Sequence, residues 1–213
     1  METNQTKVWT SEFGKNYNSR NIYDTLEDHN NSYYEFYGKS KDDLNKEILK
    51  GLPKDLKILE VGSNVGYQLA SLKRYGFTKL FGIEIQRECV DKSKKLWDGI
   101  DIIYGSGFDI PYKDNFFDLV FTNNVLIHIS PNDIDLVLDE MYRVSAKYIY
   151  GFEYFSENYE TVEYRNHKDL LWKTDFESLF LKKFKNIKSV FNKKYNCLNF
   201  EGNIDKAYIL EKF

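Results

Sequence analysis

The chain has 213 residues and a net charge of −3, with 42% hydrophobic and 30% charged residues. These values are typical of one soluble domain, and they give no reason to expect nucleic acid or an anionic membrane as a partner. No apolar run approaches the roughly 20 residues that cross a bilayer. The first residues, METNQTKVWT, also lack a signal-peptide pattern. Cys89 and Cys197 are far apart and lack metal-ligand spacing, so we expect buried free thiols in a cytoplasmic protein.

The first 50 residues are polar and aromatic and contain no strand-like run. The stretch DDLNKEILK at 42–50 predicts a short helix, because its apolar residues share one face. Gly51 and Pro53 then end this helix. We therefore expect residues 1–50 to form a helical extension and residues 51–213 to form the main domain.

From residue 56 onward, β-rich apolar runs alternate with helical patterns, which indicates a parallel sheet with helices on both faces. Pro131 suits the start of the last helix in this series. The expected strands are 56–61, 79–85, 100–105, 116–124 and 146–155, and the expected helices are 66–76, 87–99 and 131–144.

The end of the chain breaks this alternation. Residues 184–195 and 205–213 are two β-like runs without a helix between them, and they predict an antiparallel hairpin at the end of the sheet. The fold class is therefore α/β, a doubly wound and mostly parallel Rossmann-like sheet. The lysines in FLKKFKNIKSVFNKKY are interpreted as a protected strand edge, and a nucleic-acid surface is the alternative.

The most specific stretch is LEVGSNVG at 59–66, a glycine turn between a strand and a helix. Such a turn brings backbone N–H groups close to a ligand. No lysine and hydroxyl follow Gly66, which disfavours a nucleoside triphosphate, and Asn64 breaks the dinucleotide pattern. A carboxylate at Glu60 repels a pyrophosphate and attracts a cation. The turn therefore predicts a ligand that carries an ammonium group and a ribose.

The next strands complete this ligand. Glu84 ends the second strand, 22 residues after Gly62, where an acid accepts hydrogen bonds from ribose hydroxyls. The third strand ends in YGSGFDIPY, whose backbone can flank an adenine. The fourth ends in TNNVLIHI, beside the first turn.

These segments, together with the closing hairpin, resemble the class I S-adenosylmethionine-dependent methyltransferases over roughly residues 45–213. The resemblance implies a seven-stranded sheet with an antiparallel last strand, and S-adenosylmethionine as a cationic donor that leaves S-adenosylhomocysteine. Glycine is usual where Asn64 stands, but asparagine tolerates a positive φ. Ser106 replaces the usual acid beside the adenine, and Asp109 is expected to order its loop. The expected cofactor-binding residues are Tyr17, Arg20, Glu60, Gly62, Ser63, Asn64, Gly66, Glu84, Ile85, Ser106, Gly107, Phe108, Asn123 and Asn124.

A narrower resemblance spans the whole chain. The segments WTSEFGKNYNSRN, FTNNVLIHISP and EYRNHKDLLWKTDF look like the methylases associated with pseudaminic acid biosynthesis. This resemblance implies a place beside bacterial nonulosonic-acid sugar pathways. TNNV stands where an Asn-Pro-Pro-Tyr-like motif would follow the fourth strand, and no basic target-recognition domain is present, so a small polar metabolite such as an activated or acidic sugar is the leading acceptor. We expect neither a nucleic acid nor a membrane as a partner of this protein, and we expect no metal. The alternatives are a methyltransferase for another amine or carboxylate metabolite, and an inactive nucleoside-binding module.

Five residues are candidates for the acceptor side. His128 follows the fourth strand, near the expected methyl group, and Glu153 closes the fifth strand as a candidate general base. Tyr164, Arg165 and His167 lie in the next loop, where the arginine suits an acidic substrate. Structural roles are the alternative for each of them.

The N-terminal aromatic residues Trp9, Phe13 and Tyr17 recur at a spacing of four, as on one face of a helix. Core packing is the usual role of such a stripe. Because no strand precedes it, we favour a lid over the donor, with Arg20 reaching the donor carboxylate.

Overall fold

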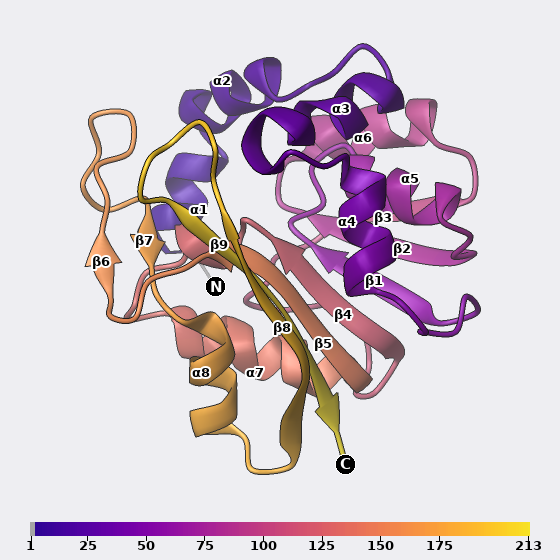
Figure 1. Ribbon diagram of the computed structural model, residues 1–213. Helices are drawn as coiled ribbons and strands as arrows, with labels where there is room; N and C mark the ends of the chain where they lie inside the picture. The colour runs from indigo at the N-terminus through magenta and orange to yellow at the C-terminus, as the bar shows by residue number, and fades with distance from the viewer. Residues whose placement is uncertain (1–2) are drawn as a thin grey trace.

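The structure is a computed structural model that describes residues 3–213. The described part of the chain forms a seven-stranded sheet in the order β3-β2-β1-β4-β5-β9-β8, which confirms the predicted class. Neighbouring strands from β3 to β5 are parallel, and β9 runs antiparallel between β5 and β8 (Figure 1). The strands are β1 (Lys57–Val61), β2 (Lys79–Glu84), β3 (Ile100–Tyr104), β4 (Phe117–Asn123), β5 (Ser145–Tyr154), β8 (Ile187–Asn196) and β9 (Ile204–Lys212).

Helices cover both faces of the sheet, because strand side chains alternate between two cores. One core packs the sheet against α4, α5 and α6, and the other packs it against α7 and α8. The helices are α4 (Lys41–Ile48), α5 (Tyr67–Arg74), α6 (Arg87–Leu96), α7 (Ile134–Val144) and α8 (Phe176–Lys183). α7 begins three residues after Pro131, because residues 131–133 form a turn.

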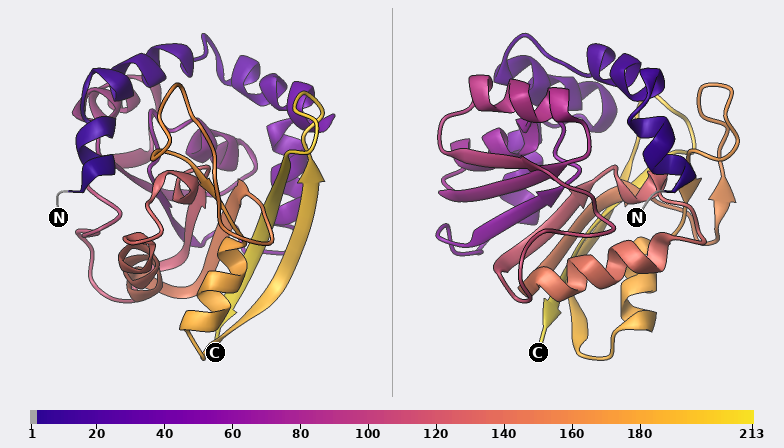
Figure 2. Two further views of the ribbon diagram at one scale, coloured as in Figure 1. Left: turned by 90° about the vertical axis from the view of Figure 1, so that its left-hand side faces the viewer. Right: turned by 180° about the vertical axis from the view of Figure 1, so that it is seen from behind.

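The N-terminal segment is helical, as predicted. It contains α1 (Asn4–Trp9), α2 (Glu12–Arg20) and α3 (Leu26–Tyr37). α4 follows as part of the core, since Leu44 and Ile48 are buried. In Figure 2, α1 and α2 lie beside the loop after β5, which carries the short strands β6 (Glu160–Thr161) and β7 (Trp172–Lys173).

The prediction that Trp9, Phe13 and Tyr17 lie on one face of a single helix is wrong in one respect. Trp9 ends α1 and Ser11 caps α2, so the chain turns between Trp9 and Phe13. The Ser11 hydroxyl accepts a hydrogen bond from the Phe13 N–H, which starts a new helix.

Both cysteines are free thiols; Cys89 is buried, whereas Cys197 is only partly buried. No helix among residues 3–213 is long and apolar enough to cross a membrane.

Candidate active site

A cavity of about 440 Å³ lies at the carboxyl ends of the strands, where open α/β sheets bind ligands. Its wall combines the glycine turn, the ends of β2 and β4, the loop after β3 and the N-terminal helices. Most of the sequence-predicted cofactor residues line it: Tyr17, Glu60, Gly62, Ser63, Asn64, Glu84, Ile85, Ser106, Gly107, Phe108, Asn123 and Asn124. His128, Tyr164 and Arg165 line it as well.

The glycine turn is held in a conformation that few residues adopt. Gly62 has φ +74° and Asn64 has φ +50°, so asparagine does take the left-handed conformation expected of it. The N–H groups of Gly62 and Ser63 donate to the carbonyl of Ile83 at 2.9 and 3.1 Å. A Cβ at Gly62 would lie 2.8 Å from Val125 Cγ2. The turn therefore requires glycine at this position for two separate reasons.

Two acids from neighbouring strands face this turn. Glu84 accepts hydrogen bonds from the N–H groups of Asn64 and Gln86, both at 2.8 Å. Burial raises the pKa of the Glu84 carboxyl, and these N–H groups oppose the rise. Burial also raises the pKa of the Glu60 carboxyl well above its usual range, while the positive charge of Lys41 opposes that rise. Glu60 Oε2 is buried and has no hydrogen-bond partner, so it is free to accept a hydrogen bond from a ligand.

Asn18 ties the N-terminal helices to the donor side of the cavity. Its side chain, 4% exposed, donates to Gln86 Oε1 at 2.6 Å and accepts from Asn64 Nδ2 at 2.9 Å. Gly14 also lets α2 lie close to the end of α1, because a Cβ at this position would lie only 1.9 Å from the carbonyl oxygen of Trp9. α2 therefore sits on the glycine turn through polar contacts that the aromatic spacing did not predict.

The aromatic residues instead meet the acceptor side. The Trp9 ring packs edge-on against Phe13, Tyr17 and His128, with centroid distances of 5.4, 5.1 and 4.6 Å respectively. Phe13 in turn packs against the Tyr164 ring at 6.2 Å. The stripe thus brings α1 and α2 onto the loop after β5.

His128 ends the 3-10 turn η1 (Leu126–His128), on the wall of the cavity. Its Nδ1 lies 2.7 Å from the carbonyl oxygen of Leu170. A carbonyl only accepts, so Nδ1 carries the proton and Nε2 carries the lone pair. Burial lowers the pKa of the His128 imidazole to about 4, so the ring is neutral at pH 7.

Four predicted residues do not line the cavity. Arg20 is exposed, because it follows the inward-facing Asn18 by two residues, about 200° around the helix. Gly66 faces the protein interior, where a Cβ would lie 2.6 Å from Ile102 Cδ1. His167 bridges back to Tyr164 and packs on Phe13 outside the cavity wall.

Glu153 is the fourth of these residues. It is 1% exposed and accepts hydrogen bonds from the N–H groups of Val125 and Ile127, at 3.2 and 3.4 Å. Burial raises its pKa to about 7. The structure thus gives Glu153 contacts that hold the loop after β4, rather than a position from which to reach a substrate.

The structure also brings residues to the site that the sequence patterns did not indicate. His29, Tyr33 and Gln68 line the cavity, and the Tyr33 hydroxyl accepts a hydrogen bond from Gln68 Nε2 at 2.6 Å. Gln5 lines it from α1, and its Oε1 is buried without a partner. Lys41 lies behind this wall. His29 and Lys41 both belong to the N-terminal segment, which carries no recognisable motif.

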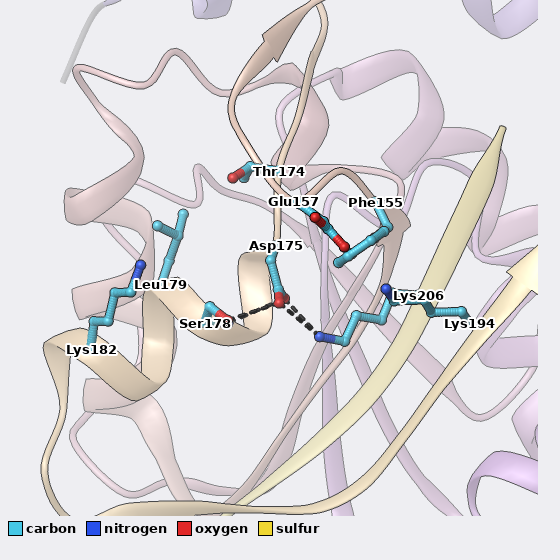
Figure 3. Close-up of a pocket in the computed structure, with 9 residues that line it drawn as sticks. All are labelled: Phe155, Glu157, Thr174, Asp175, Ser178, Leu179, Lys182, Lys194 and Lys206. Atoms are coloured by element: carbon cyan, nitrogen blue, oxygen red, sulfur yellow. Dashed lines mark hydrogen bonds and ion pairs between the residues drawn. The ribbon is translucent and has the colours of Figure 1, made fainter. Parts of the chain in front are cut away.

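A second cavity, of about 270 Å³, lies between α8 and the β8–β9 hairpin. Figure 3 shows Asp175 on its wall, where Lys206 donates at 2.8 Å and the Ser178 hydroxyl also donates at 2.8 Å. No sequence-predicted site residue lines this cavity. The Asp175 carboxylate already has these partners, so we place the functional site in the larger cavity.

Comparison with known families agrees with this geometry. Residues 59–148 match the family model described as a methyltransferase domain. The chain therefore contains a methyltransferase domain. The match starts at the glycine turn and ends within β5, and it therefore includes the turn, Glu84 and the ends of β3 and β4. No curated protein matches the chain.

Solved structures share the fold of this methyltransferase at low sequence identity. Magnesium protoporphyrin IX methyltransferase from Synechocystis PCC 6803, solved with bound S-adenosylmethionine, has a TM-score of 0.69 and 11% identity. That likeness covers 100% of this chain and 99% of that one. An S-adenosylmethionine-dependent methyltransferase from Aquifex aeolicus has a TM-score of 0.62 and 18% identity over 87% of this chain and 96% of that one. The [4+2]-cyclase SpnF has a TM-score of 0.64 and 12% identity over 84% and 86%.

The cavity fits a cationic donor such as S-adenosylmethionine. Among the described residues that line it, Arg165 is the one Lys or Arg, whereas Glu60 and Glu84 supply two acids on the donor side. The unpartnered Glu60 Oε2 suits an ammonium hydrogen. A pyrophosphate would find no cation at this end of the cavity and two carboxyl groups instead.

Proposed function

We propose that this methyltransferase acts on a small polar metabolite, with an acidic sugar of nonulosonic-acid biosynthesis as the leading candidate. The observation that carries this proposal is the acceptor half of the cavity. Beyond the donor residues, the wall is polar and aromatic, with Trp9, His128, Tyr154, Tyr164 and Arg165. An arginine at such a wall suits a carboxylate.

The donor half is assigned to the residues that face the first turn. Bound S-adenosylmethionine supplies an electrophilic methyl group on a sulfonium sulfur. Glu60 is assigned to the donor ammonium group and Glu84 to the ribose hydroxyls. Phe108 and the Ser106 hydroxyl are assigned to the adenine, where serine accepts a hydrogen bond without the charge of the usual acid.

On the acceptor side, His128 is the group placed to take a proton. Its Nδ1–H is held by the Leu170 carbonyl, which fixes the tautomer and leaves Nε2 as an acceptor. The low pKa of His128 keeps it unprotonated at neutral pH. An acceptor hydroxyl can therefore donate its hydrogen to Nε2 while it is held near the methyl group, and positioning of this kind supplies much of the rate in a displacement.

Residues 8–20 are proposed as a lid over both halves. Asn18 contacts the glycine turn on the donor side, whereas Trp9 and Phe13 contact His128 and Tyr164 on the acceptor side. One segment thus bridges the two half-sites. Its closure would exclude water from the reacting atoms.

Methyl transfer from labelled S-adenosylmethionine tests the proposal. The panel contains a nonulosonic acid, its neutral precursor sugars, and simple amines and carboxylates. We expect labelled product with the acidic sugar, and we expect Arg165→Gln to raise KM for that substrate with little effect on a neutral one. Lys168→Gln is the matched control, since Lys168 is exposed in the same loop and does not line the cavity.

The result also separates the alternatives. Methyl transfer to an amine or a simple carboxylate, with none to the sugars, would show that the substrate is such a metabolite and not an acidic sugar. Tight donor binding without turnover of any compound in the panel would favour a nucleoside-binding module.

A further inference from the structure

A lysine is buried beside the donor half of the cavity. Lys41 is 2% exposed, although lysine is almost never fully buried without a partner. It is also the first residue of α4, where the helix dipole disfavours a positive charge. Burial lowers the pKa of Lys41 to about 7, and the negative charge of Glu60 opposes this fall. Local helix and burial preferences are therefore both violated at this position, as is common at functional sites.

The Lys41 ammonium group contacts the cavity wall from behind. Its Nζ donates to Asn123 Oδ1 at 3.0 Å, and it lies 4.9 Å from the Tyr33 ring centroid and 5.2 Å from that of Phe152. Glu60 is its electrostatic partner, yet no hydrogen bond reaches Glu60 Oε2. The charges of Lys41 and Glu60 thus interact electrostatically, while Glu60 Oε2 remains without a hydrogen bond.

These contacts decide what the wall presents to a ligand. An ammonium group only donates, so Asn123 must turn its oxygen toward Lys41 and its Nδ2 hydrogens away from it. Asn123 lines the cavity, where those N–H groups can meet an acceptor. Glu60 keeps a free acceptor oxygen in the same region. The wall therefore offers an N–H donor for a carboxylate and a carboxylate for an ammonium group.

An α-amino acid carries this pair of charges, and S-adenosylmethionine ends in one. We propose that Lys41 is a positioning residue for the amino-acid end of the donor, acting through Asn123 and Glu60. This inference rests on the donor half-site assigned under the proposed function. It extends that site to α4, which the glycine turn and the strand ends did not indicate.

The test uses ligands that differ only at the amino-acid end. S-adenosylhomocysteine carries this end, and 5′-methylthioadenosine has the same nucleoside and a thioether but lacks it. Titration calorimetry with the full chain gives the Kd of each ligand for the unaltered protein and for Lys41→Met. Lys39→Met is the matched control, because Lys39 lies two residues earlier and its charge pairs with Glu47 at the surface.

We expect Lys41→Met to weaken S-adenosylhomocysteine about tenfold or more, as for the loss of a hydrogen bond to a charged group. Binding of 5′-methylthioadenosine should change less than about twofold, and Lys39→Met should change neither ligand. A purely structural lysine would weaken both ligands together, because both need the same nucleoside site. Equal weakening of the two ligands, or no weakening of either, overturns the proposal.

Two further outcomes are decisive. If Lys41→Met does not fold, Lys41→Gln retains a donor for Asn123 and removes the charge, and the same selective weakening of S-adenosylhomocysteine is required of it. If the unaltered protein binds neither ligand, the donor site itself is refuted, and this is seen before any variant is compared.

Discussion

Replacing Glu84 with alanine tests the donor site at its most specific side chain. In the structure, the Glu84 carboxylate accepts hydrogen bonds from the N–H groups of Asn64 and Gln86, and it faces the cavity at the carboxyl end of β2. The side chain thus serves the turn and the ligand at once. Alanine removes both contributions.

The two effects have different sizes. A ribose hydroxyl pair that loses a charged acceptor weakens binding by about 1–3 kcal/mol, or about 5- to 150-fold in Kd. The two N–H groups border the cavity, so water can replace the carboxylate, and we expect the free energy of unfolding to fall by about 1–2 kcal/mol. A domain of this size retains its fold after such a loss.

Titration calorimetry with S-adenosylhomocysteine measures the first effect, and urea denaturation measures the second. Glu88→Ala is the control, because Glu88 is an exposed acid on α6 whose ion pair with Lys92, at 3.4 Å, is worth little. Unchanged affinity in a folded Glu84→Ala protein would remove Glu84 from the donor site. Equal losses in Glu84→Ala and Glu88→Ala would show a nonspecific charge effect.

Three further predictions address the lid, the histidine and the turn. Hydrogen exchange in residues 8–20 should slow when S-adenosylhomocysteine binds, because ordering this segment loses backbone entropy that the ligand offsets; full protection in the free protein would indicate ordinary core packing instead. The pKa of His128 is lowered to about 4 by burial, so the unfolded chain, with an ordinary pKa near 6.5, takes up the proton first as the pH falls. The stabilisation from His128 is therefore complete above about pH 7 and is lost toward pH 4. In urea denaturation, the free energy of unfolding of the unaltered protein should fall by about 2 kcal/mol relative to that of His128→Asn between pH 8 and pH 5. Parallel pH profiles of the two proteins would contradict this. Gly62→Ala should lower the free energy of unfolding by about 1–3 kcal/mol in the same assay, because its φ is +74° and a Cβ meets Val125 Cγ2 at 2.8 Å; a variant as stable as the parent would show that the turn relaxes.

The parts of the site that follow a strand were predictable from the sequence, because strand ends in a parallel sheet converge on one edge. The glycine turn, Glu84 and the end of β4 all belong to this class. Even the positive φ of Asn64 followed from its place in the turn. Each of these positions depends on local conformation and on the order of the strands, and both leave a pattern in the sequence.

Side-chain direction was harder to predict. Glu153 and Tyr154 both close β5, but neighbouring residues of a strand point to opposite sides. Tyr154 lines the cavity, and Glu153 turns to the N–H groups of the loop after β4. A sequence pattern places both residues at the strand end and does not tell which one faces the ligand.

The polar contacts of the N-terminal helices could not be predicted from local patterns. Lys41 meets Asn123 across 82 positions in the chain, and Asn18 meets Gln86 across 68. Such contacts depend on how α2 and α4 pack on the sheet. Neither helix carries a motif that specifies its partner.

The central claim is that the cavity binds a cationic nucleoside donor rather than a dinucleotide. Titration calorimetry of the unaltered protein with S-adenosylhomocysteine, and separately with NAD, tests it most directly. We predict saturable binding of S-adenosylhomocysteine at one site per chain and no binding of NAD, because the donor half presents Glu60 and Glu84 and no cation that could hold a pyrophosphate. Tight binding of NAD without binding of S-adenosylhomocysteine would contradict the account.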